Sequence, residues 1–116
     1  MEAAGAVAAE NQALRVMMDA AGLPQTAGGV FVSGGSAGNL SALVVARDTA
    51  RRTRAAAGIS DGRLRVLVSD QAHSSIKNAL NIVAMDAVVI PTSKGRLDAD
   101  ALASVTDAQL DDVVAI

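Results

Sequence analysis

Residues 32–40 read Val-Ser-Gly-Gly-Ser-Ala-Gly-Asn-Leu, and residues 69–75 read Ser-Asp-Gln-Ala-His-Ser-Ser. The first segment ends a short apolar run, breaks into glycines and opens a long helical pattern. Such a turn places bare backbone N–H groups and a hydroxyl at a helix N-terminus, where an anion such as phosphate is stabilised. The second segment puts His73, the single histidine, on a loop after another apolar run. Two such loops at neighbouring strand ends predict a site for a flat, phosphorylated ligand.

The pattern around these segments alternates between helix and strand. We expect helices at residues 3–21, 36–57, 74–83 and 98–104, and strands at 29–32, 64–69, 87–90 and 111–116. Gly22 and Gly58 are expected to end the first two helices, and Ser74 or Ser75 to cap the third. This alternation predicts an α/β fold of three layers around a mainly parallel sheet. Ligands of such sheets bind outside the carboxyl ends of the strands, so both loops should lie at one edge.

Composition excludes several classes of function. The chain has 116 residues, of which 51% are hydrophobic, so it can bury a core. A net charge of −2 gives no sign of nucleic-acid binding, and no apolar run is long enough to span a membrane. The absence of cysteine excludes disulfides and thiolate metal sites and fits a cytoplasmic protein. The aspartates between residues 98 and 112 are interpreted as helix caps and solvated surface, so no metal site is expected.

The glycine-serine loop allows two interpretations. Backbone N–H groups of Gly35, Ser36 and Ala37, with the Ser36 hydroxyl, could hold a phosphate, while glycine at positions 34 and 35 would leave the anion room. The same residues would also suit a tight strand-to-helix turn with Ser36 as the N-cap. The loop lacks the Lys-Ser/Thr of a P-loop and the glycine order of a dinucleotide fingerprint. His73 could likewise be a structural histidine.

Two motifs together resemble a known family. Ser33-Gly34-Gly35-Ser36 followed by Asn39-Leu40, and then Gln71-Ala72-His73-Ser74-Ser75, resemble the group II pyridoxal-phosphate-dependent decarboxylases. That family includes the aromatic amino acid, histidine, glutamate and diaminobutyrate decarboxylases. Ala37-Gly38 stands where many relatives have Glu-Ala, which we interpret as variation within the family.

The resemblance implies a fold, a cofactor and an activity. It implies part of the large domain of a fold type I enzyme that uses pyridoxal 5′-phosphate to remove the α-carboxylate of an L-amino acid, as a homodimer. It also implies that Gly34, Gly35, Ser36 and Ala37 bind the cofactor's phosphate. His73 would stack on the pyridoxal ring, which gives it both a cofactor-binding and a catalytic role.

No residue matches the lysine that forms the family's Schiff base, or the aspartate that pairs with the ring nitrogen. The two lysines, Lys77 and Lys94, and the candidates Asp70 and Asp86 all lie outside the matching motifs. We therefore expect residues 1–116 to be one partial cofactor-binding domain, incomplete at both ends and inactive alone. Two alternatives stay open: another fold type I pyridoxal-phosphate enzyme, such as an aminotransferase or a lyase, and a non-catalytic phosphate-binding fragment. The substrate amino acid is not indicated.

Overall fold

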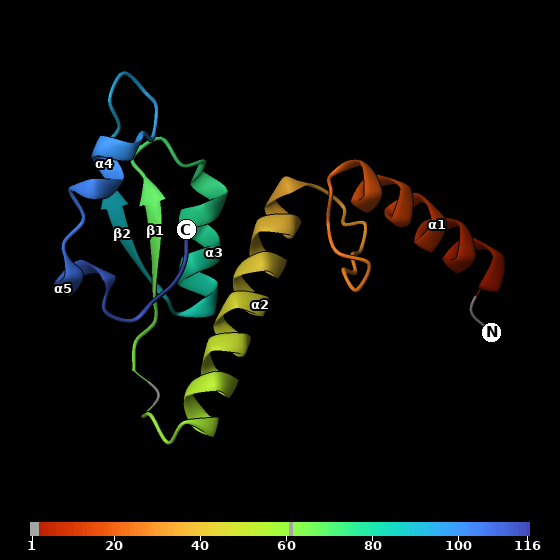
Figure 1. Ribbon diagram of the computed structural model, residues 1–116, viewed down its shortest axis with the longest axis horizontal. Coiled ribbons are helices and arrows are strands. Elements are labelled where there is room, and N and C mark those ends of the chain that lie inside the picture. Colours follow the sequence, from red (N-terminus) through yellow and green to blue (C-terminus); the bar gives the residue numbers. More distant parts are fainter. Residues whose placement is uncertain (1–2, 61) are drawn as a thin grey trace. The chain divides into compact units, whose positions relative to one another are not determined.

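The computed structural model describes residues 3–60 and 62–116 and divides into two compact units, Met1–Ser33 and Gly34–Ile116 (Figure 1). The first unit contains helix α1 (Ala4–Ala20). The second contains, in chain order, α2 (Gly35–Ala56), β1 (Arg65–Ser69), α3 (Ser74–Val83), β2 (Asp86–Ile90), α4 (Ala99–Ala103), α5 (Asp107–Leu110) and β3 (Val113–Ala115). No helix within the described residues combines the length and the apolar character needed to cross a membrane.

In the first unit, the segment after α1 folds back along the helix. Gly22 ends α1 with a φ of 67°, a left-handed conformation that suits glycine. The Arg15 side chain then donates to the carbonyl of Ala27 at 3.2 Å, and the Phe31 N–H donates to Glu10 Oε1 at 3.2 Å. These contacts tie the returning segment to α1 by side chains rather than by a backbone ladder.

The prediction of a strand at residues 29–32 is wrong. The segment is irregular, and its side chains Val30, Phe31 and Val32 are all exposed. A β-strand is stable only when its backbone groups pair with a neighbouring strand. No strand in the described part of the chain pairs with this segment, so its β-branched residues do not produce one.

The sheet of the second unit is parallel, as expected, and has the order β2-β1-β3. β1 and β2 pair over their whole length, from Arg65 opposite Asp86 to Ser69 opposite Ile90. β3 pairs only with the first two residues of β1 and shows an irregularity between them. The last strand is therefore shorter than the predicted 111–116, whereas β1 and β2 lie within one residue of the predicted bounds.

Helices cover both faces of this sheet. Successive residues of a strand point to opposite faces, and Val66 and Leu67 of β1 are each only 3% exposed. Val66 packs with Leu43 of α2 and Leu80 of α3 in the main core cluster. Figure 1 shows α2 and α3 on one side of the strands, with α4 and α5 on the other. The predicted layered α/β fold is confirmed.

The capping residue agrees with expectation at α4 and differs from it at α3. α3 begins at Ser74, but its N-cap is His73, whose side chain accepts from the Ser75 N–H, and not Ser74 or Ser75. Asp98 caps α4 as expected, accepting from the Ala101 N–H at 2.9 Å. The four-residue helix α5 was not predicted, because one turn is too short to show a helical period.

We expect Leu80→Ala to destabilise the fold by about 2–5 kcal/mol, because Leu80 is 3% exposed and the truncation leaves a cavity in the core. Ile82→Ala on the same helix is the matched control: Ile82 is 70% exposed, so its loss should change stability by less than about 0.5 kcal/mol. Urea unfolding followed by circular dichroism measures both. Equal losses in the two variants would contradict this core.

Candidate functional site

The two segments singled out in the sequence meet at one end of the second unit. β1 and β2 are parallel, so their carboxyl ends lie at the same edge, and α2 and α3 both begin at that edge (Figure 1). The Asn39 Nδ2 group of α2 donates to Ser75 Oγ of α3 at 3.0 Å. The predicted placement of both loops at the carboxyl edge of the sheet is therefore found for residues 34–37 and 69–73.

Helix α2 begins without a cap. Gly34 is its N-cap residue, and no side chain accepts a hydrogen bond from the first turn. The first helical hydrogen bond runs from the Gly38 N–H to the Gly34 carbonyl at 3.0 Å. The N–H groups of Gly35, Ser36 and Ala37 therefore have no helical acceptor, and no other acceptor for them occurs within the described residues.

Ser36 and Gly35 leave this helix start open. Ser36 is the second residue of α2 and not its N-cap, so the interpretation of Ser36 as a capping residue is wrong. Its side chain is exposed, and its hydroxyl has no hydrogen-bond partner among the described residues. At Gly35, an added Cβ would meet no heavy atom within 4 Å in the described part of the chain, and its φ is not positive. Neither packing nor backbone conformation there requires glycine.

A cavity of about 250 Å³ connects the starts of the two helices. Its lining comes from α2 and α3 and includes Ser36, Ala37, Leu40, Ser75, Asn78 and Ile82. A second, mostly apolar cavity of about 380 Å³ lies beside the C-terminal half of β1, where Asn39 and Ala72 form part of the wall. Asn39 lines the second cavity and Ser75 lines the first, and the two side chains bond to each other.

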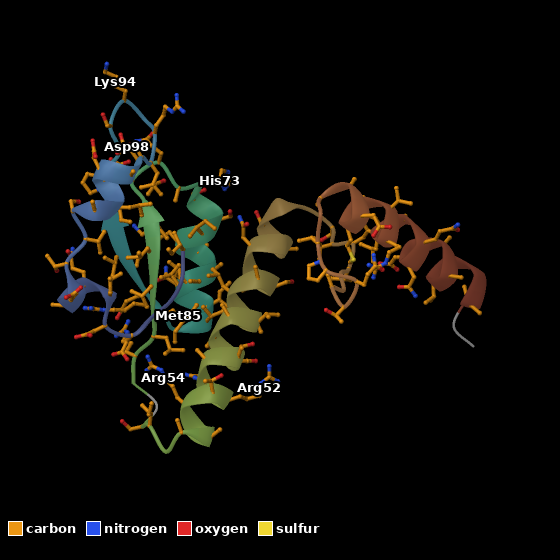
Figure 2. The ribbon with its side chains drawn as sticks, viewed as in Figure 1. Arg52, Arg54, His73, Met85, Lys94 and Asp98 are labelled. Carbon is orange, nitrogen blue, oxygen red and sulfur yellow. The ribbon has the colours of Figure 1, made fainter. Side chains whose placement is uncertain are left out.

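His73 sits at the N-terminal end of α3 (Figure 2). Its ring is exposed, and its Nδ1 atom accepts from the Ser75 N–H at 3.1 Å and lies 2.9 Å from Ser75 Oγ. The sequence analysis gave Asn39 no role beyond its place in the family motif, and gave Ser75 only a possible role as a helix cap. The spacing of Ser75 two residues after a histidine at a helix start is the signal that could have indicated the ring's partner.

Neither lysine lies at this cavity. Lys77 lines a different hollow of about 300 Å³, together with Arg63 and Asp86, which form an ion pair at 2.7 Å. Lys94 is exposed at the tip of a turn (Figure 2), where its φ is 52°. That neither lysine is the family's covalent lysine stays a prediction.

Two of the acidic residues near the C-terminus have defined partners. Asp98 caps α4, as the sequence predicted. Asp112 Oδ1 lies 2.7 Å from Arg54 Nη2, which fastens the loop before β3 to the far end of α2. No group of three or more acidic, histidine or cysteine residues in the described part of the chain is arranged to hold a metal ion.

Asp70 holds the loop between β1 and His73 in place. Its Oδ1 atom accepts from the Thr92 hydroxyl at 2.7 Å, and its N–H donates to the Ile90 carbonyl at 3.0 Å. Hydrogen bonds from the side chain and backbone of Thr92 hold the pKa of the Asp70 carboxyl below its ordinary value. The loop that carries His73 is thereby tied to the segment that follows β2.

Comparisons with known proteins agree on one family. The family model described as the pyridoxal-dependent decarboxylase conserved domain matches residues 2–113. A glutamate decarboxylase-like protein from Gibberella zeae is 40% identical over 85 residues, which is 70% of this chain and 16% of that protein. The chain therefore spans about a sixth of the length of this relative.

We expect Thr92→Val to raise the pKa of Asp70 toward its ordinary value, because the variant removes the hydroxyl donor. A carboxyl whose pKa is lower in the folded than in the unfolded state stabilises the fold above its ordinary pKa, and this contribution is lost as the pH falls through the lowered value. Carboxyl-carbon NMR titration of Asp70 measures the shift. Thr92→Ser keeps a hydroxyl and should keep the lowered pKa; an unchanged titration in Thr92→Val would refute this assignment.

Proposed function

The chain belongs to the pyridoxal-dependent decarboxylase family, and on that basis we propose that the protein containing it removes the α-carboxylate of an L-amino acid. Pyridoxal 5′-phosphate is the cofactor that this family membership implies. One observation carries the proposal for this chain: the uncapped start of α2, with three N–H groups lacking acceptors, lies at the same edge as His73. We propose the substrate class, the reaction and the roles of single residues.

The start of α2 fits the phosphate of this cofactor. An anion at a helix N-terminus is stabilised by free N–H groups and by the positive end of the helix dipole, and α2 is 22 residues long. The exposed Ser36 hydroxyl adds a fourth donor. The open space beside Gly35 lets an anion approach the backbone, which accounts for a glycine that packing does not require. We therefore assign phosphate binding to Gly34, Gly35, Ser36 and Ala37.

His73 is proposed to cover the cofactor's ring. The family resemblance implies that this histidine stacks on the ring face, and its exposed position beside the start of α2 supports that role. A flat imidazole excludes water from the face that it covers, and it presents a polar nitrogen to the substrate's carboxylate. Its contribution would be to orient the ring and the departing carboxylate.

The cofactor, when bound, supplies an electron sink for the pair left behind as carbon dioxide departs. The residues of this chain supply binding and orientation: donors of α2 hold the phosphate, and His73 fixes the ring. We propose that the lysine attaching the cofactor lies outside residues 1–116, since neither Lys77 nor Lys94 lines the cavity at Ser36. The homodimer and the cytoplasmic location stay predictions.

Carbon dioxide release tests the proposed reaction. The intact protein, loaded with pyridoxal 5′-phosphate, should release carbon dioxide from at least one L-amino acid in a panel that begins with glutamate, because the matched relative is called glutamate decarboxylase-like. Amino transfer to a keto acid without carbon dioxide would favour the aminotransferase alternative. Cofactor binding without turnover of any amino acid would favour a non-catalytic phosphate-binding role. Borohydride trapping of the cofactor on Lys77 or Lys94 would overturn the assignment of the covalent lysine.

Ser36→Ala should weaken cofactor affinity in the intact protein roughly 10- to 100-fold, because a hydrogen bond to a charged group is worth about 1.5–3 kcal/mol. Titration of the apoprotein with pyridoxal 5′-phosphate, followed by absorbance, measures the Kd. Ser41→Ala, an exposed serine on the same helix, is the matched control and should keep the parental Kd. Gly35→Ala should leave the fold intact yet weaken binding, since its added methyl group meets only open space in the protein. An unchanged Kd in both Ser36→Ala and Gly35→Ala would show that the cofactor's phosphate does not bind at this helix start.

His73→Ala should act on turnover far more than on cofactor binding. Loss of the orienting ring is expected to lower kcat by about 10²-fold, while the cofactor Kd changes by less than about tenfold. Steady-state decarboxylation and cofactor titration of the same preparation give the two numbers. Near-parental turnover with normal cofactor binding would make His73 a structural helix cap only.

A further inference from the structure

The hydrogen bonds around His73 determine which ring nitrogen carries the proton. Ser75 donates its backbone N–H to His73 Nδ1 at 3.1 Å. A backbone amide is always a donor, so Nδ1 must present its lone pair. In a neutral imidazole one nitrogen accepts and the other carries the hydrogen, which places the hydrogen of His73 on Nε2.

The Ser75 hydroxyl and Asn39 complete the same arrangement. Ser75 Oγ lies 2.9 Å from His73 Nδ1, and because Nδ1 accepts, the hydroxyl must donate to it. The hydroxyl oxygen is then left to accept, and it receives the Asn39 Nδ2–H at 3.0 Å. The three groups form a directed chain from Asn39 through Ser75 to the ring, and each has one consistent donor or acceptor role.

Burial shields this chain of hydrogen bonds from competing water. Ser75 is 9% exposed, and Asn39 is partly buried and lines the cavity beside the C-terminal half of β1. Water therefore competes poorly for the Ser75 hydroxyl, and the hydrogen bonds that set its direction are held by packing. His73 is exposed, so its Nε2–H remains available to a ligand.

We propose that Asn39 and Ser75 are positioning residues that hold His73 as its neutral Nε2–H tautomer. His73 then serves as a hydrogen-bond donor to an acceptor such as a substrate carboxylate oxygen, and not as a base at Nε2. Asn39 lies one turn beyond the uncapped start of α2, so the same helix that offers donors to a phosphate also sets the histidine's tautomer. The functional part of this inference rests on the proposed decarboxylase activity, whereas the tautomer itself does not.

Histidine-selective ¹⁵N NMR of the intact protein measures the tautomer directly. His73→Gln identifies the His73 resonances by their loss. We expect an unprotonated-type Nδ1 and a protonated-type Nε2 in the parent protein. An Nδ1–H tautomer, or an averaged mixture of the two forms, would overturn the proposal.

Asn39→Asp tests the positioning role with nearly the same shape. A carboxylate cannot donate, so the Ser75 hydroxyl would turn toward it and away from the ring. Among the described contacts, only the Ser75 N–H then still donates to Nδ1, so the variant should weaken the preference of His73 for the Nε2–H tautomer and lower kcat about three- to tenfold. An unaltered tautomer in the folded variant would contradict the role of Asn39.

Two serine variants act as controls. Ser75→Thr keeps the hydroxyl and should keep the parental tautomer, whereas Ser74→Ala removes an exposed neighbouring hydroxyl with no hydrogen bond to the ring among the described contacts and should change nothing. A tautomer shift in Ser74→Ala would show a general disturbance of the α3 start and refute the specific chain. If the parent protein holds the Nε2–H tautomer while His73→Ala keeps full turnover, the proposed role of His73 in turnover fails and the tautomer assignment stands.

Discussion

The parallel pairing of β1 with β2 is the constraint on which the rest of the second unit depends. Two parallel neighbours cannot be joined by a tight turn, so the chain must cross back over the sheet, and α3 makes that crossing. The crossing places the carboxyl ends of both strands and the start of α3 at one edge. α2 packs beside α3 in the same direction and brings its own start to that edge. This arrangement places every residue to which we assign a role in ligand binding at the same edge of the sheet.

The two helices that start at this edge differ in capping. α3 is closed by His73, whose ring accepts from the Ser75 N–H. α2 has no cap and begins with a glycine that packing does not require. An uncapped start costs stability, and such departures from local rules are typical of functional sites. The far end of α2 is joined to the loop before β3 by the Arg54–Asp112 ion pair.

The sequence by itself determined the elements whose apolar pattern is strong. Residues 74–83 carry buried side chains at Ala79, Leu80 and Val83, a helical spacing, and α3 has the bounds predicted for it. The β-branched runs of β1 and β2 were predicted to within one residue for the same reason. The glycine-serine turn and the histidine loop were also placed at one edge, because parallel strands leave only one edge for the loops that follow them.

Only the tertiary structure decided the features that need contact with another segment of the chain. The apolar residues at 29–32 do not form a strand, because no neighbouring strand in the described chain pairs with them. The N-cap of α3 depends on which side chain reaches the Ser75 N–H, and that side chain is His73 and not a serine. The bond from Asn39 to Ser75 joins residues 36 positions apart and exists only because α2 packs on α3. The local sequence pattern indicates which backbone conformation a segment prefers. A hydrogen bond between side chains that are distant in the sequence forms only after packing has brought them within about 3 Å of each other.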